Sequence, residues 1–291
     1  MSSPSRMRVA LAQMEVVALD PKRNLERIAA TLDELAVDRP DLVVFPELAD
    51  LGQVTERDKA FGARYADAAE PVPGGFSDAI GALAVAHDCH IAVGVAERHP
   101  DIAGTIYNTA LLVDPQGAVV GRQRKLHPAG EERHYFAAGA AVEVVSCDLG
   151  VVSLVVCYDA YFPEVPRAAA LQGAELLCGL FNITHRPDWP HRLAQLAAVR
   201  AYENMQHVVF VNRVGTDHGR TFGGESAATT PPGLLLAEGP PAEEWHTTVD
   251  LDRERLLEAR AERTVFADRR PDVYQLDQPS TTGRGGGREE R

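Results

Sequence analysis

The sequence predicts an α/β protein in which helices cover the outside of a β-sheet sandwich. Two observations support this prediction. Short, almost continuously apolar segments, which are typical of buried strands, alternate along the chain with segments of helical periodicity. This alternation occurs in two halves, with antiparallel segments between them. The chain has 291 residues, of which 45% are hydrophobic, so it is long enough to bury a large core as one domain.

The first half contains apolar runs that predict strands and two segments with helical spacing. Leu25, Ile28, Leu32 and Leu35 recur on one helical face, and Pro21 suits a first helical turn. The turn sequence at 114–117, Asp-Pro-Gln-Gly, predicts a hairpin. The expected strands are Arg8–Gln13, Leu42–Phe45, His90–Val95, Ile106–Val113 and Ala118–Arg122, and the expected helices are Pro21–Ala36 and Phe76–His87.

The second half begins after a polar segment, Gln123–Ala141, that has no clear periodicity and predicts a long loop of the kind that often carries function. We expect residues 1–277 to form a single domain. Residues 278–291 are rich in Gly, Ser and Arg, which predicts a disordered tail. The expected strands are Ala141–Val145, Val151–Val156, Glu175–Leu180, His207–Val211, Ser226–Thr229, Leu234–Ala237 and Thr247–Leu251, and the expected helices are Pro163–Gln172 and Trp189–Met205.

Charge and composition disfavour several classes of partner. The formal net charge of −13 argues against binding to nucleic acid or to an anionic membrane surface. We find neither an apolar stretch long enough to cross a bilayer nor a signal-peptide pattern, and we therefore expect a cytoplasmic protein. The four cysteines show no metal-ligand spacing, so we expect neither a metal site nor a required disulfide.

Cys157 differs from the other cysteines in its surroundings. The apolar strand Val151–Val156 ends at Cys157, and a helix is expected from Pro163. This strand–turn–helix order exposes a nucleophile at the carboxyl edge of a sheet and directs backbone N–H groups toward it. A buried cysteine at the end of a strand is the alternative interpretation, and for the motif taken alone it is the better one.

Three charged residues complete a possible catalytic set. Glu47 follows an apolar strand, where burial would raise its pKa and let it transfer protons near neutral pH. Lys125 follows the hairpin and could stabilise an oxyanion. Glu132, in the polar loop, could orient Lys125. Each residue taken alone also fits an ordinary surface charge.

The order of these motifs resembles that of the nitrilase superfamily, the carbon–nitrogen hydrolases. Phe45-Pro46-Glu47, Arg124-Lys125 and Cys157-Tyr158-Asp159 resemble the three motifs that carry the family's Glu–Lys–Cys triad. Further similar segments cover roughly residues 7 to 275; they include 132–136, 162–164, 171–175, 200–204, 211–215, 222–226 and 269–274. The resemblance implies a four-layer αββα sandwich, in which two mixed sheets carry helices on their outer faces.

The resemblance also implies a mechanism. Cys157 would be the nucleophile, Glu47 the general base and acid, Lys125 the stabiliser of the oxyanion, and Glu132 the residue that orients Lys125 and substrate. The chain would then be an amidohydrolase that cleaves an amide or N-carbamoyl bond through a thioester, without a metal or organic cofactor. Intact candidates at all four positions argue against the alternative of a non-catalytic binding relative.

The identity of the substrate stays open at this point. Tyr158-Asp159 stands where nitrilases typically have Trp-Glu, which favours amides or N-carbamoyl amines over nitriles. Ala160 and Tyr161 occupy places where relatives often hold a substrate carboxylate with Arg, although His185 or Arg186 could substitute. The carboxylates of Asp159 and Glu164 make a neutral or amine-bearing substrate plausible, unless both are structural.

Residues near these motifs are the candidates for substrate contacts. They are Tyr158, Tyr161, Asn182 and His185. Relatives commonly form homodimers or larger homo-oligomers through the helices near the nucleophile. Here those helices are the ones expected at Pro163–Gln172 and Trp189–Met205, and the number of subunits is left open.

Overall fold

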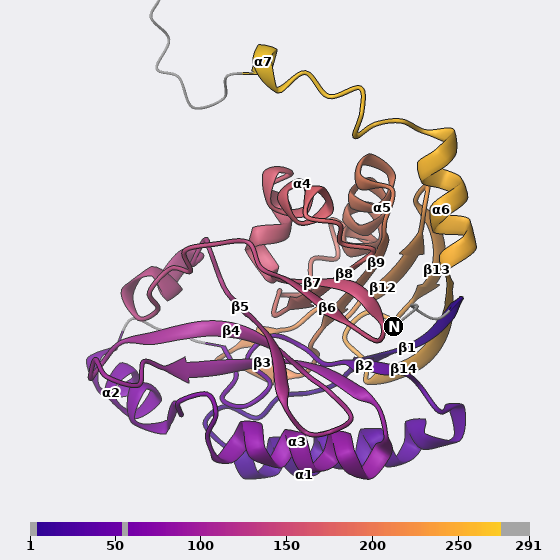
Figure 1. The fold of residues 1–291 in the computed structure, drawn as a ribbon. Coiled ribbons are helices and arrows are strands. Elements are labelled where there is room, and N and C mark those ends of the chain that lie inside the picture. The colour runs from indigo at the N-terminus through magenta and orange to yellow at the C-terminus, as the bar shows by residue number, and fades with distance from the viewer. Residues whose placement is uncertain (1–4, 54–57, 275–291) are drawn as a thin grey trace, which may run out of the picture.

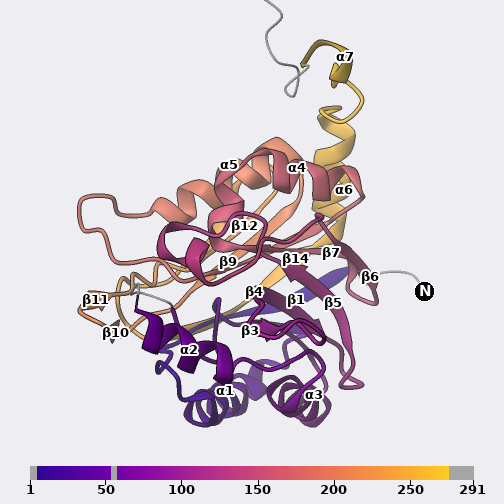
Figure 2. The same cartoon turned by 90° about the vertical axis from the view of Figure 1, so that its left-hand side faces the viewer.

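A computed structural model describes residues 5–53 and 58–274. Two six-stranded sheets stack against each other, with helices on both outer faces, as Figures 1 and 2 show from two directions. Both sheets mix parallel and antiparallel strands. This arrangement confirms the predicted αββα sandwich. The tail predicted at 278–291 lies outside the described residues.

The first sheet is built around three parallel strands. Leu42 of the middle strand pairs with Val9 on one side and His90 on the other. Antiparallel strands extend the sheet in both directions, in the order β14-β1-β2-β3-β4-β5. The strands are β1 (Arg6–Gln13), β2 (Leu42–Val44), β3 (His90–Arg98), β4 (Ile106–Val113), β5 (Val119–Arg124) and β14 (Trp245–Asp252).

The second sheet repeats this plan. Leu176 of its middle parallel strand pairs with Val152 and His207. The strand order is β13-β12-β9-β8-β7-β6. The strands are β6 (Val144–Cys147), β7 (Gly150–Val156), β8 (Leu176–Phe181), β9 (His207–Asn212), β12 (Ala227–Thr230) and β13 (Leu234–Glu238), and a separate two-stranded ribbon consists of β10 (Thr216–Asp217) and β11 (Arg220–Thr221).

Helices form the outer layers. Two of them, α1 and α3, cover the first sheet, and α4 and α5 cover the second (Figure 2). None of the helices in the described ranges is long and apolar enough to cross a membrane. The α-helices are α1 (Pro21–Leu35), α2 (Lys59–Ala68), α3 (Gly75–His87), α4 (Glu164–Leu171), α5 (Arg192–Asn204), α6 (Arg253–Glu262) and α7 (Pro271–Tyr274).

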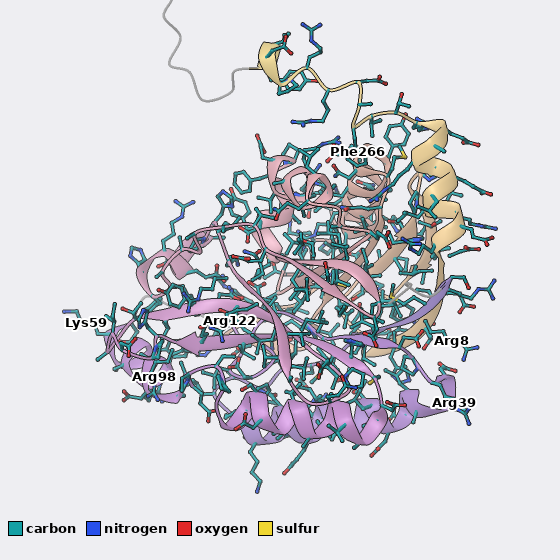
Figure 3. The ribbon with its side chains drawn as sticks, in the orientation of Figure 1. Arg8, Arg39, Lys59, Arg98, Arg122 and Phe266 are labelled. Atoms are coloured by element: carbon teal, nitrogen blue, oxygen red, sulfur yellow. The ribbon has the colours of Figure 1, made fainter. Side chains whose placement is uncertain are left out.

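Strand alternation divides the core between the layers. Val9 and Leu11 of β1 lie in the cluster between the two sheets, whereas Ala10 and Ala12 pack with the buried faces of α1 and α3. Because both faces are covered, the central strands are apolar almost throughout. Figure 3 shows labelled charged side chains such as Arg8, Arg39 and Lys59 at the rim of the molecule.

The structure corrects some expected boundaries and adds elements. Helix α2 was not predicted, because Gly62 in its interior disfavours a helix and few of its residues are buried. Helix α6 buries only Leu256 and Ala259, so its sequence shows little amphipathic pattern. The expected loop Gln123–Ala141 begins inside β5 and contains a 3₁₀ turn, η2 (Gly130–His134).

Candidate active site

The predicted site residues follow the carboxyl ends of strands from both sheets. Glu47 follows β2, Lys125 follows β5, and Cys157 follows β7. The two sheets contact each other beside Glu47: its backbone N–H donates to the carbonyl of Phe181 in β8 (3.4 Å). Carboxyl ends of parallel strands are where open α/β sheets place ligands.

Cys157 lies at a sharp turn. Strand β7 ends at Val156, and Cys157 begins the 3₁₀ turn η3 (Cys157–Tyr161) with a φ of +47°. A positive φ is unfavourable for a residue with a side chain and often marks a functional position. The thiol is buried, with 7% of the residue exposed.

Glu47, Lys125 and Glu132 form a buried ionic cluster. The Lys125 Nζ atom lies 2.6 Å from Glu47 Oε1 and 2.7 Å from Glu132 Oε2. The 3₁₀ turn η2 carries Glu132, whose Oε2 also accepts the backbone N–H of Ala129 (2.9 Å). Each of the three residues is at most 1% exposed. The structure thus brings Glu47 together with Lys125, 78 positions later in the sequence, and with Glu132 of the following turn.

Two amides that the sequence analysis missed complete this cluster. Asn108 Nδ2 donates to Glu47 Oε1 (2.7 Å), and Gln53 Nε2 donates to Glu132 Oε1 (3.1 Å). Asn108 is fully buried in β4, a strand that is mostly apolar but also contains Tyr107 and Thr109. A buried amide in such a strand needs a polar partner, so its presence in that run was the available signal.

The pKa values of both Glu47 and Lys125 are raised in this cluster. Burial raises the pKa of Glu47 above 4.5, and Lys125 opposes this increase only in part. Burial also acts against the Lys125 ammonium, but its electrostatic interactions with Glu47, Cys157 and Glu132 outweigh this effect and raise the pKa of Lys125. Lys125 therefore stays protonated, and Glu47 can accept a proton more readily than an exposed carboxylate.

Cys157 is held mainly as a neutral thiol. Burial raises its pKa well above 9.0, and the charge of Glu47 adds to this effect, whereas Lys125 and a hydrogen bond from the Asn182 backbone act in the opposite direction. A proton acceptor is therefore needed before the sulphur can attack. Glu47 Oε2 is buried and has no hydrogen-bond partner among the described residues, so this oxygen is free for that purpose.

The proposed substrate contacts divide into two groups. Tyr158 and Tyr161 lie on the turn that follows Cys157, with their ring centroids 5.9 Å apart. Asn182 follows β8 and places Nδ2 3.5 Å from the Glu47 carbonyl. His185 is further along the same loop, where its backbone N–H donates to Thr221 (2.8 Å). Its buried Nδ1 atom makes no hydrogen bond within the described ranges.

For Asp159 the structure favours the structural role that the sequence analysis left open over contact with a substrate amine. Asp159 is only 1% exposed and accepts hydrogen bonds from Leu126 and His127. Glu164 is exposed on α4. Arg186, considered as a partner for a substrate carboxylate, instead forms an exposed ion pair with Asp188 (2.7 Å).

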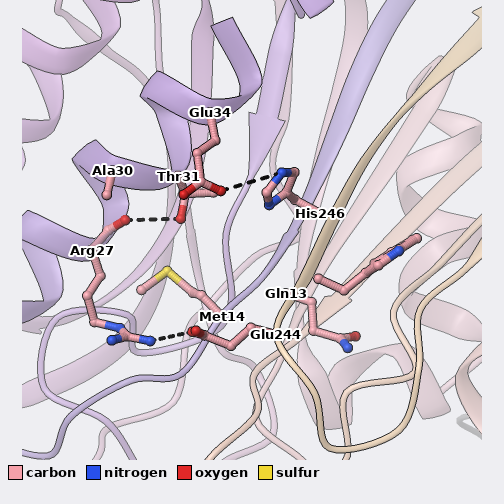
Figure 4. A pocket seen from close by; sticks show the side chains of 9 residues that line it. Gln13, Met14, Arg27, Ala30, Thr31, Glu34, Glu244 and His246 are labelled. Atoms are coloured by element: carbon pink, nitrogen blue, oxygen red, sulfur yellow. Dashed lines mark hydrogen bonds and ion pairs between the residues drawn. The ribbon is translucent and has the colours of Figure 1, made fainter. Parts of the chain in front are cut away.

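Other cavities and clusters lie outside this site. A cavity of about 470 Å³ between α1 and β14 is shown in Figure 4; its acidic groups pair with Arg27 and His246. One group in the described part of the chain could hold a metal ion: His90, Cys147 and Asp148, whose ligand atoms lie within 4.8 Å of one another. These residues lie at the start of β3, at the end of β6 and in the turn between β6 and β7.

Comparison with known proteins agrees with this fold and identifies the family. The carbon–nitrogen hydrolase family matches residues 8–261. The chain therefore belongs to this family, and it is a hydrolase of carbon–nitrogen bonds other than peptide bonds. This confirms the family that the ordered motifs predicted.

Individual relatives include an amidase and a nitrilase. An (R)-stereoselective amidase from a Pseudomonas species is 36% identical over 266 residues, which cover 91% of this chain and 92% of the relative. A nitrilase from Pyrococcus abyssi is 30% identical over 274 residues, which cover 92% and 99%. A mutant amidase from Nesterenkonia sp. AN1, with acrylamide added at its active-site cysteine, superposes with a TM-score of 0.75 at 28% identity and covers 88% of this chain and 97% of its own.

Proposed function

We propose that this protein hydrolyses a small linear amide through a thioester on Cys157. The observation that carries the proposal is the buried cluster in which Lys125 bridges Glu47 and Glu132 beside a cysteine at a strained strand end. Burying three charged side chains is costly unless they are paired and hydrogen-bonded. A site built at this cost, next to a nucleophile, is well suited to catalysis.

The reaction begins with proton transfer from the thiol. As the Cys157 sulphur attacks the amide carbon, Glu47 accepts the thiol proton, and its unpartnered Oε2 is the oxygen available for it. Negative charge develops on the amide oxygen. The Lys125 ammonium stabilises that oxygen together with the backbone N–H of Tyr158.

The tetrahedral intermediate then collapses. Glu47 returns the proton to the leaving nitrogen, the C–N bond breaks, and ammonia or an amine leaves. A water molecule, deprotonated by Glu47, attacks the thioester and yields a carboxylic acid and the free thiol. Glu47 therefore acts in turn as base, acid and base, while Glu132 holds Lys125.

The surroundings of Cys157 favour a small, uncharged acyl group. Tyr158, Tyr161 and Phe162 contribute aromatic rings on the turn beside the nucleophile. The carboxylate of Asp159 is occupied by backbone donors, and the guanidinium of Arg186 by Asp188. N-carbamoyl amines fit the same chemistry, because their ureido carbon also carries a leaving nitrogen.

Nitrile hydrolysis is the second candidate, and the nitrilase relative from Pyrococcus abyssi supports it. A nitrile would also form a thioester on Cys157, after addition of water and loss of ammonia. A panel of short aliphatic amides, aromatic amides, ureido compounds and nitriles, assayed for release of ammonia or amine, separates the candidates. We expect the amides to be the best substrates, and turnover of nitriles alone would contradict that expectation.

The nucleophile is tested by substitution and by mass. Cys157→Ala should reduce turnover by at least about a thousandfold while the protein stays folded by circular dichroism. Rapid quenching of the wild type should reveal a mass increase equal to the acyl group on the peptide that contains Cys157. Full activity in Cys157→Ala would contradict the mechanism, and Cys147→Ala, a partly buried cysteine elsewhere, is the matched control.

A further inference from the structure

Asp159 connects the nucleophile turn to the segment that carries Lys125. Its Oδ2 atom accepts the backbone N–H of Leu126 (2.9 Å), and its Oδ1 atom accepts the backbone N–H of His127 (2.8 Å). The Nδ1 atom of His127 also lies 2.8 Å from Oδ1. One buried carboxylate thus binds the two residues that directly follow Lys125.

The contact of Asp159 with Leu126 and His127 joins a segment that follows the first sheet to a turn that follows the second. As Lys125 leaves β5, its backbone N–H donates to the Asn108 carbonyl of β4 and its carbonyl accepts from the backbone N–H of Gly139, at 2.8 Å each. Cys157 leaves β7 of the second sheet, two residues before Asp159. The His127 ring stacks on Phe162, with centroids 3.9 Å apart, and reinforces the same contact between the sheets.

We propose that Asp159 is a positioning residue that fixes the Lys125 ammonium relative to the Cys157 sulphur. It does so by binding the backbone after Lys125 from the turn that carries the nucleophile. The proposal rests on the proposed roles of Lys125 and Cys157. Because a displacement of about 1 Å in a catalytic group can cost a hundredfold in rate, a rigid connection between the two sheets is functionally important.

Alkylation of Cys157 measures this geometry without a substrate. Iodoacetamide reacts with the thiolate, and Lys125 favours that thiolate in proportion to its proximity. The full-length wild type and Asp159→Asn are treated at one pH, and the modified Cys157 peptide is quantified with time. We expect Asp159→Asn to react about tenfold more slowly, because Lys125 moves away from the sulphur.

The sign of the effect separates positioning from charge. Removal of a negative charge near the sulphur would by itself favour the thiolate and accelerate alkylation. Faster alkylation in Asp159→Asn, or an unchanged rate, would therefore overturn the proposal.

A double-mutant cycle tests whether Asp159 acts through Lys125. We expect Lys125→Gln and the double variant Lys125→Gln/Asp159→Asn to be alkylated at the same slow rate. Additive effects would overturn the positioning role alone. An unchanged rate in Lys125→Gln would overturn both the positioning role and the proposed role of Lys125 in the mechanism.

Two further variants keep the test valid if Asp159→Asn does not fold. His127→Phe removes one of the three donors and retains the stacking on Phe162, so a smaller decrease in the alkylation rate is expected. Glu175→Gln is the matched control, because Glu175 accepts two hydrogen bonds from Arg253 at the opposite end of β8. Glu175→Gln should lower thermal stability and leave the rate of Cys157 alkylation unchanged. An equal decrease of the alkylation rate in His127→Phe and Glu175→Gln would contradict the proposal.

Discussion

The two carboxylate oxygens of Glu47 have different surroundings. Oε1 accepts hydrogen bonds from Lys125 (2.6 Å) and Asn108 (2.7 Å), whereas Oε2 is buried and has no partner among the described residues. The asymmetry orients the carboxylate and leaves one oxygen for the thiol, the leaving group and water. A single carboxylate can then perform three successive proton transfers.

The raised pKa of Glu47 predicts the acid limb of the pH profile. Glu47 must be ionised to accept the thiol proton, so activity should fall as the pH drops through its raised pKa. The midpoint of this limb in kcat/KM should lie above 4.5, the ordinary value for Glu. The measurement is kcat/KM against pH with a neutral amide. A midpoint at or below 4.5 would contradict the assignment of Glu47 as the base.

The contact between β3 and the segment after β2 determines where Glu47 lies. The backbone N–H of Gly94 donates to Pro46 (3.1 Å), and its carbonyl accepts from Ala49 (2.7 Å). A Cβ atom at Gly94 would lie 2.5 Å from the Leu48 nitrogen and 2.6 Å from the Glu47 Cα. Only glycine allows this strand to lie so close to the backbone that carries the catalytic carboxylate.

Gly94→Ala should therefore impair catalysis as well as stability. We expect kcat to fall about tenfold or more, because the backbone of Glu47 must move, and the free energy of unfolding to fall by about 1–3 kcal/mol. Steady-state kinetics measures the change in kcat, and urea denaturation measures the change in the free energy of unfolding.

Gly121→Ala is the control for this substitution. Its added Cβ would meet the end of the Val145 side chain at 2.5 Å rather than a backbone. It should affect stability but leave the kcat of the folded protein unchanged. Equal kcat values in Gly94→Ala and the wild type would show that this contact does not position Glu47.

The outer surface of the second helical layer predicts self-association. Leu171 on α4 and Val199 and Tyr202 on α5 are 45%, 51% and 50% exposed. The segment after α6 runs above these helices, and α7 stands clear of the sheets in Figures 1 and 2. We propose that a second copy of the chain covers this face, since exposed apolar patches commonly mark interfaces.

Val199→Asp tests this interface. The substitution should increase the fraction of monomer, as measured by light scattering after size-exclusion chromatography, because a charge would be buried between copies. Val85→Asp is the control, since Val85 is 55% exposed on α3 of the opposite helical layer. A wild-type protein that is monomeric at micromolar concentration would contradict the proposal.

The sequence by itself determined the α/β class, most strands and helices, and the four candidate residues Glu47, Lys125, Glu132 and Cys157. This was possible because burial leaves a local record: apolar strands that end at a charged or nucleophilic residue, and helices with an apolar face. The motif order then predicted the αββα fold and the family.

Only the tertiary structure decided which side chains meet. Asn108 lies in a mostly apolar strand, and its contact with Glu47 depends on the register between β3 and β4. Asp159, which the sequence suggested as a contact for a substrate amine, instead binds backbone donors across the two sheets. Such contacts join residues distant in the chain, and a local pattern does not record which partner satisfies a buried polar group.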